Sequence, residues 1–158
     1  MDSGRKYKLC FKLGVDTMAE NVSGIEVGHE VTFETTVTQE NINLFADVTG
    51  DHNPLHSDVD YASKTRFKQP IAHGMFGAGI ISAALGTRLA PSSVVVYLGQ
   101  NLKFRAPVVA GDHITAQCSV TMVDPEKSRI NLQTNVVNQD GVEVIIGDAQ
   151  VMIDELAE

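Results

Sequence analysis

A long run without charge in the middle of the chain limits the folds open to this sequence. Residues 74–90 predict one helix, and no Asp, Glu, Lys or Arg occurs between Gly74 and Leu85. This helix is apolar on nearly every side, so we expect it to be buried on most of its surface. The uncharged run has about half of the roughly 20 residues that cross a bilayer, so we expect no membrane insertion. The rest of the chain must therefore supply a surface that wraps the helix.

Segments in which apolar and polar residues alternate lie on both sides of this helix. One precedes it, at residues 27–37, and four follow it. The four are residues 101–105, 114–122, 130–136 and 142–153. Short turn signals, DPEK at 124–127 and QDG at 139–141, are typical of antiparallel strands that follow one another in sequence. We predict an α+β domain in which an antiparallel sheet wraps around the long helix.

A second helix is expected directly after the first strand. Thr38 offers an N-cap, and the stretch QENINLFADVTG places Ile42, Phe45 and Val48 on roughly one face before it ends at Gly50. This helix leads into a polar loop.

Length and charge limit the classes of partner. The 158 residues suit one domain, and the formal net charge of -8 argues against a general nucleic-acid binder, because phosphate contacts need a basic face. An anionic ligand would need a local basic patch. The basic residues nearest in sequence to the motifs below are Lys64, Arg66, Lys68, Lys103 and Arg105.

The cysteines and the N-terminus bear on the compartment. Cys10 and Cys118 predict reduced, core-filling thiols in an intracellular protein. Among the first thirteen residues, four are basic and one is acidic, which suggests organellar targeting. The apolar residues there alternate at period two, whereas a targeting helix should show the helical period. Mitochondrial and cytoplasmic locations both stay open.

The loop GDHNPLH at residues 50–56 carries the first group of chemically active side chains. The X-Pro step makes Asn53 extended, so that Asp51 and His56 flank a bend and can face a common space. A carboxylate and a neutral imidazole can together orient a water and pass its proton. The structural alternative is that Asp51 caps a turn, Asn53 makes a local bond to the backbone, and His56 lies on the surface.

The dipeptide His73-Gly74 stands at the predicted start of the long helix. Free backbone N–H groups and the helix dipole make such an end suited to an oxyanion. Gly77 and Gly79 follow in the helix interior, where glycine is unfavourable and marks a close approach. Either a ligand or tight packing on the sheet would account for them.

Other chemistries fail on spacing. The glycines at 74–79 lack the residues that a dinucleotide fingerprint or a phosphate loop requires. DHN at 51–53 lacks the later ligands of a calcium loop, and His52 and His56 have Pro54 between them and no obvious third ligand. We therefore predict neither a metal nor a redox cofactor.

Three stretches together resemble a known family. FADVTGDHNPLHSDVDYA, FKQPIAHGMFGAGIISAALG and VVVYLGQNLKFRAPVVAGD are similar, in order and spacing, to the MaoC-like (R)-specific enoyl-CoA hydratases and the related 3-hydroxyacyl-thioester dehydratases. The resemblance covers residues 25–153. It implies a hotdog fold, a homodimer whose sheets join edge to edge, and reversible addition of water to a trans-2-enoyl thioester of CoA or acyl carrier protein.

The resemblance also implies roles for single residues. Asp51 and His56 would be the catalytic pair, Asn53 an active-site partner, Gly74 the oxyanion N–H donor, and Ser82 a residue of the substrate pocket. We assign His73 to substrate binding as well, and Arg66 and Lys68 because an anionic carrier needs local positive charge. These assignments include no metal ligand.

We divide the chain into an N-terminal extension, residues 1–24, and a MaoC-like hotdog domain, residues 25–158. Two other functions stay open. A hotdog thioesterase would carry a carboxylate on or near the central helix, but no Asp or Glu occurs between Gly74 and Leu89. A non-catalytic acyl-binding subunit would not need the Asp51 and His56 pair.

Overall fold

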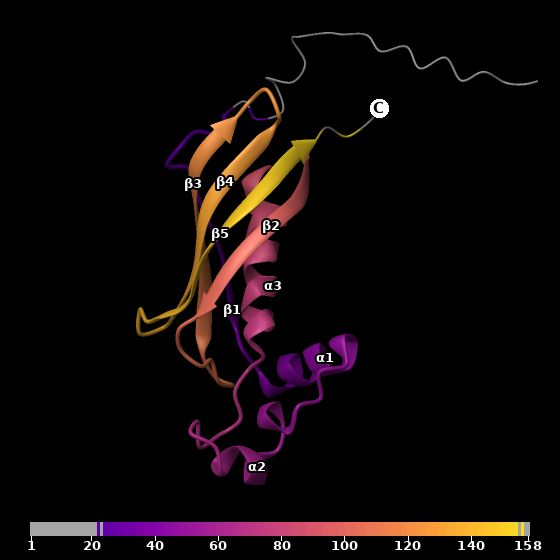
Figure 1. Cartoon of the computed structure of the whole chain (residues 1–158), viewed down its shortest axis with the longest axis vertical. Helices are drawn as coiled ribbons and strands as arrows, with labels where there is room; N and C mark the ends of the chain where they lie inside the picture. The colour runs from indigo at the N-terminus through magenta and orange to yellow at the C-terminus, as the bar shows by residue number, and fades with distance from the viewer. Residues whose placement is uncertain (1–21, 23, 155, 157–158) are drawn as a thin grey trace, which may run out of the picture.

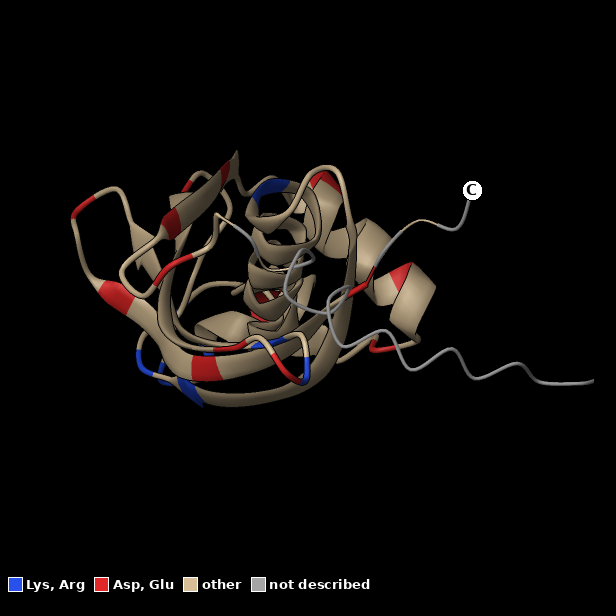
Figure 2. Ribbon diagram, turned by 90° about the horizontal axis from the view of Figure 1, so that it is seen from above, with Lys and Arg blue, Asp and Glu red and all other residues tan. Residues whose placement is uncertain are grey.

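The computed structural model describes residues 22, 24–154 and 156. A curved antiparallel sheet wraps the helix α3, and two further helices, α1 and α2, lie beyond one end of it (Figure 1). Figure 2, which looks down on the molecule, shows the sheet curling around the helix. The predictions made for Cys10 and for the first thirteen residues lie outside the described residues. Within the described part of the chain, no helix is long and apolar enough to cross a membrane.

The sheet has five strands in the order β1-β3-β4-β5-β2, and every neighbouring pair is antiparallel. The strands are β1 Glu30–Thr36, β2 Val94–Phe104, β3 His113–Asp124, β4 Arg129–Asn138 and β5 Glu143–Asp154. β1 and β2 are therefore the two edges. One strand before the helix and four after it confirm the predicted α+β hotdog architecture.

The helices are α1 Gln39–Thr49, α2 Val59–Ser63 and α3 Gly74–Ala84, and a π-helical turn, Leu85–Leu89, continues α3. The caps predicted for α1 are confirmed. Thr38 accepts a hydrogen bond from the Asn41 backbone N–H within a capping box, and Gly50 ends the helix with φ of 78°. That left-handed conformation suits glycine and turns the chain into the polar loop.

One face of α3 packs on the concave side of the sheet. Gly77, Ile81 and Ala84 on this face are buried, whereas Met75 on the other face is 57% exposed. The prediction that the helix would be buried on most of its surface is therefore wrong for the single chain. The sheet is one layer, so it covers one side of the helix and leaves the other side to line a cleft.

Strand β2 begins seven residues before the predicted segment 101–105. Its first residues, Val94–Tyr97, do not alternate in polarity, and a bulge between Tyr97 and Gly99 shifts the pairing with β5. A bulge adds one unpaired residue and so breaks the period of two that identifies a strand in a sequence.

Cys118 on β3 is a buried free thiol, as predicted. Burial raises its pKa to about 12. The thiol therefore stays protonated and behaves as a small apolar core residue.

Candidate active site

The loop after α1 is fixed by short-range hydrogen bonds. Asn53 accepts a hydrogen bond from the Leu55 N–H at 3.1 Å and so caps a 3₁₀ turn, Pro54–His56. The Gln39 side chain at the start of α1 donates to the His56 carbonyl at 3.1 Å. Pro54 suits this turn because its fixed φ matches a first helical position. The local backbone bond considered for Asn53 is thus present, and the Asn53 side chain does not line the cleft described below.

The segment that leads into α3 runs beside this loop. The Ile71 N–H donates to the Leu55 carbonyl at 3.3 Å, and the Ala72 N–H donates to the Val108 carbonyl at 2.7 Å. α3 then begins at Gly74, and His73 is its N-cap residue without a side-chain capping bond. The first of these bonds brings the start of α3, with its free N–H groups, beside the loop of residues 50–56.

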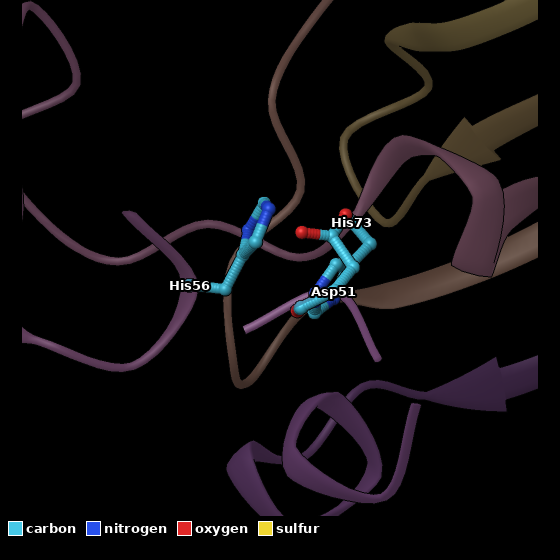
Figure 3. Close-up of side chains that lie close together, drawn as sticks. All are labelled: Asp51, His56 and His73. Atoms are coloured by element: carbon cyan, nitrogen blue, oxygen red, sulfur yellow. Dashed lines mark hydrogen bonds between the residues drawn. The ribbon is translucent and has the colours of Figure 1, made fainter. Parts of the chain in front are cut away.

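Three side chains from these two segments meet at one place (Figure 3). Asp51, His56 and His73 each offer a polar atom, and these atoms lie within 4.8 Å of one another. The His56 and His73 rings stack with centroids 3.7 Å apart and planes inclined by 31°. Asp51 is exposed, whereas both histidines are buried, His73 with 4% exposure. The common space predicted for Asp51 and His56 therefore exists.

Backbone carbonyls determine which ring nitrogens carry protons. His56 Nδ1 lies 2.7 Å from the Ile71 carbonyl oxygen, and His73 Nε2 lies 2.9 Å from the Asp51 carbonyl oxygen. A carbonyl only accepts, so in the neutral rings these two nitrogens are the donors. The free lone pairs are then at His56 Nε2 and His73 Nδ1. The first can act as a base, and the second has no hydrogen-bond partner among the described residues.

A cleft of about 850 Å³ contains the site and lies between α3 and the edge strand β2. Its lining residues are Phe45, Thr49, Asp51, His56, His73, Gly74, Met75, Ala78, Gly79, Ser82, Tyr97, Gln100, Leu102 and Phe104. The lining is mostly apolar with a few convergent polar groups, which is typical of a small-molecule site. Ser82, predicted as a residue of the substrate pocket, is part of this lining.

The β2 side of the cleft carries polar residues that the sequence analysis did not identify. The Tyr97 hydroxyl donates to Gln100 Oε1, and Gln100 Nε2 donates to Oγ1 of the buried Thr134 at 2.9 Å. Burial, with the Cys118 thiol close by, raises the pKa of Tyr97 to about 12. The phenol therefore stays neutral and keeps its proton for this bond. A tyrosine and a glutamine next to Gly99 in an otherwise apolar stretch were the available signal.

A second pocket of about 360 Å³ shares four residues with the cleft, His73, Gly74, Met75 and Phe104. Arg66 and Arg105 line it, and the Arg66 guanidinium lies 4.8 Å from the centre of the Phe67 ring. Lys68 lines neither pocket. Of the two basic residues assigned to substrate binding, Arg66 lines the pocket next to the cleft and Lys68 lines neither.

Asp51, His56 and His73 are also residue types that bind metals. Each histidine donates one N–H to a backbone carbonyl, as metal-bound histidines usually do. The nearest ligand atoms of the three residues lie within 4.8 Å of one another. The prediction of no metal ligand stays a prediction.

The glycines of the α3 start differ in their surroundings. A Cβ atom at Gly74 would lie 2.8 Å from the Phe104 ring, and one at Gly77 would lie 2.5 Å from Ile145 Cδ1. Gly79 has no atom within 4 Å of that position and lines the cleft. Tight packing thus explains why residue 77 is a glycine. At residue 79, an added Cβ atom would meet no protein atom.

The fold and the site define a hotdog protein with a carboxylate and an imidazole at the mouth of an apolar cleft. A family model described as the MaoC like domain matches residues 21–142. The chain belongs to the MaoC-like domain family.

Individual relatives agree with this family. The chain is 43% identical to an (R)-specific enoyl-CoA hydratase from Rhodospirillum rubrum, over 87% of this chain and 94% of that protein. It is 40% identical to a 3-hydroxybutyryl-CoA dehydratase from Methylorubrum extorquens, over 82% of this chain and 81% of the relative. Among solved structures, the unliganded R-hydratase PhaJ1 from Pseudomonas aeruginosa is similar with a TM-score of 0.76 and 40% identity, over 85% and 89% of the two chains.

Proposed function

We propose that this protein is a hydro-lyase that reversibly hydrates trans-2-enoyl thioesters to (R)-3-hydroxyacyl thioesters. The observation that carries the proposal is the meeting of Asp51 and His56 in one apolar cleft, beside the first residue of α3, Gly74. The curated names of the relatives support the same reaction class.

In the hydration direction, the pair holds the attacking water. As the water oxygen bonds to C3 of the substrate, one water proton passes to the pair, and the π electrons of the double bond move toward the thioester carbonyl. C2 then receives one proton from the pair, so that the net change is addition of H and OH. His56 Nε2 and the Asp51 carboxylate are the two acceptors of the pair, and between them they take the proton from the water and return one to C2.

The negative charge that develops on the thioester oxygen needs donors. We assign this role to the Gly74 N–H at the start of α3, where the helix dipole adds to the effect. Asn53 uses its Oδ1 atom to cap the 3₁₀ turn, which leaves its NH₂ group for water or substrate. Because the Asn53 side chain does not line the cleft, its role as an active-site partner stays a prediction from the family resemblance.

The carrier of the acyl group is anionic, as either CoA or the phosphopantetheine of an acyl carrier protein. Arg66 and Arg105 give the second pocket a local positive charge on a chain of net charge -8. We propose that this pocket receives the phosphorylated end of the carrier, and that Lys68 contributes only at longer range. Arg66→Glu should then raise KM most at low salt, because salt screens exposed charges.

We propose a homodimer that forms along β2. This edge strand has eleven residues and exposes Val94, Tyr97, Leu98 and Phe104. A long apolar edge is unfavourable in a monomer, whereas the opposite edge, β1, has seven residues and outward charges at Glu30 and Glu34. A partner on β2 would also cover the cleft side of α3.

The compartment, mitochondrial or cytoplasmic, and the division into residues 1–24 and residues 25–158 stay predictions. Expression of the full chain and of residues 25–158, each with a fluorescent tag, would test them: the place of the fluorescence in the cell gives the compartment, and folding of residues 25–158 alone tests the boundary.

The test of the proposed reaction is to incubate the purified protein, without added cofactor, with crotonyl-CoA. The expected product is (R)-3-hydroxybutyryl-CoA, identified by chiral analysis, with no free thiol released. Release of CoA without hydration would instead favour a thioesterase, and neither reaction would favour a non-catalytic acyl-binding subunit. Exclusive formation of the (S) product would contradict the proposal.

A further inference from the structure

His73 was assigned to substrate binding, but its polar contacts are with the protein. Its side chain is 4% exposed, and its Nε2 atom donates to the backbone carbonyl of Asp51 at 2.9 Å. Its ring packs against Phe45, with centroids 4.9 Å apart, and against His56, at 3.7 Å. We propose that His73 is a positioning residue, which holds the Asp51 and His56 pair at a fixed place relative to the Gly74 N–H. This inference rests on the proposed function.

The bond to Asp51 joins the two halves of the site. Asp51 belongs to the loop after α1, and His73 immediately precedes Gly74, the first residue of α3. The acid-base pair and the proposed oxyanion donor come from these separate segments. The hydrogen bond from the His73 side chain to the Asp51 carbonyl is thus a direct connection between them. In the proposed reaction, this connection would fix the distance from the activated water to the thioester oxygen.

The packing of the His73 ring on His56 fixes the orientation of the His56 ring plane. The bond from Nδ1 to the Ile71 carbonyl holds one atom of the His56 ring but leaves the ring plane free to turn about that contact. Packing of the ring face on His73 removes this freedom. Since a small misplacement of a reacting group can lower a rate about 10²-fold, this orientation matters for kcat.

A contribution to the stability of the fold does not explain why a histidine occupies this buried position. Its Nδ1 atom is buried and has no hydrogen-bond partner among the described residues, which is unfavourable in the folded state. A phenylalanine would fill the same space between Phe45 and His56 without an unpaired acceptor. The feature that phenylalanine lacks is the N–H donor to Asp51.

The test compares two substitutions at position 73. His73→Phe keeps a ring for the stack and removes the donor, whereas His73→Gln keeps an N–H donor and removes the ring. For His73→Phe we expect kcat for crotonyl-CoA to fall about 10- to 10²-fold, with KM changed less than about threefold and a Tm equal to or above that of the wild type. The kcat of His73→Gln should be at least about threefold higher than that of His73→Phe, because the glutamine amide can donate to the Asp51 carbonyl.

His52→Phe is the matched control. His52 lies in the same loop but is exposed and does not line the cleft, so this variant should keep the kcat of the wild type. The pH-rate profile of His73→Phe should have the same shape as that of the wild type. Loss of one ionisation would make His73 a proton-transfer group, and a raised KM at unchanged kcat would make it a substrate ligand; either result would overturn the inference.

Hydrogen exchange separates this inference from the proposed reaction. His73→Phe should speed exchange of the amides of residues 50–56 and leave those of β3 and β4 unchanged. If the wild type hydrates no thioester, the proposed function fails, and the exchange measurement still tests the positioning role. Unchanged exchange in a folded His73→Phe variant, or unchanged kcat in an active enzyme, would show that His73 does not position the pair.

Discussion

The two faces of α3 contain glycine for opposite reasons. Gly77 faces the sheet, where a Cβ atom would lie 2.5 Å from Ile145 Cδ1. Gly79, two residues later, faces the cleft and has nothing within 4 Å of the same position. The sheet face therefore serves packing, and the cleft face leaves room for a ligand. Stability and catalysis should respond separately to changes on these two faces, and the predictions below test that separation.

The largest effect is expected at Gly74, at the end of the helix that lies beside the loop of residues 50–56. Gly74→Pro removes the proposed oxyanion N–H, and the ψ of 135° at His73 is compatible with a following proline. Losing one oxyanion donor should lower kcat by ~10² to 10³, or about 2.7 to 4 kcal/mol. Steady-state kinetics with crotonyl-CoA measures this loss.

Gly74→Ala is the control for this variant. The structure places the Phe104 ring 2.8 Å from the methyl group that this change would add. Both variants carry the same Cβ atom, so movement of Phe104 affects both, and only proline removes the N–H. If Gly74→Ala loses as much kcat as Gly74→Pro, the oxyanion role of the N–H is wrong.

On the sheet face, Gly77→Ala should reduce stability. The new methyl group forces Ile145 to move, and overpacking of this kind costs about 1 to 3 kcal/mol, partly offset by the better helix propensity of alanine. We expect a net loss of about 1 kcal/mol in the free energy of unfolding and little change in kcat. Urea denaturation measures the free energy of unfolding. An unchanged midpoint of the urea transition would mean that the sheet face of α3 is not closely packed.

On the cleft face, Gly79→Ala should act in the opposite direction. The methyl group meets no atom, so the free energy of unfolding should rise by about 0.5 to 1 kcal/mol through helix propensity. KM should change little for crotonyl-CoA and more for longer enoyl chains that reach this part of the cleft. A loss of stability here would remove the contrast between the two faces.

Local signals in the sequence predicted much of this structure. The caps at Thr38 and Gly50 depend on neighbouring residues alone, and so does the start of α3 at Gly74. The loop GDHNPLH carries its own turn chemistry, so the approach of Asp51 and His56 could also be predicted. These features need no knowledge of distant contacts.

Features that depend on the packing of distant segments could not be predicted. The exposed side of α3 follows from the position of the sheet, and the choice of Arg66 and Arg105 over Lys68 follows from the course of two loops. Tyr97 and Gln100 reach the cleft only because of the bulge in β2. The contact of His73 with Asp51 joins residues 22 positions apart and has no signature in the sequence.

The central claim is that Asp51 and His56 act together on water at the cleft. The most direct test is the kcat of Asp51→Asn with crotonyl-CoA, because this change keeps the shape of the side chain and the backbone carbonyl that His73 binds. We predict a fall of at least ~10²-fold with an unchanged Tm, since the amide cannot accept a proton as the carboxylate does. A folded Asp51→Asn enzyme with the kcat of the wild type would contradict the account.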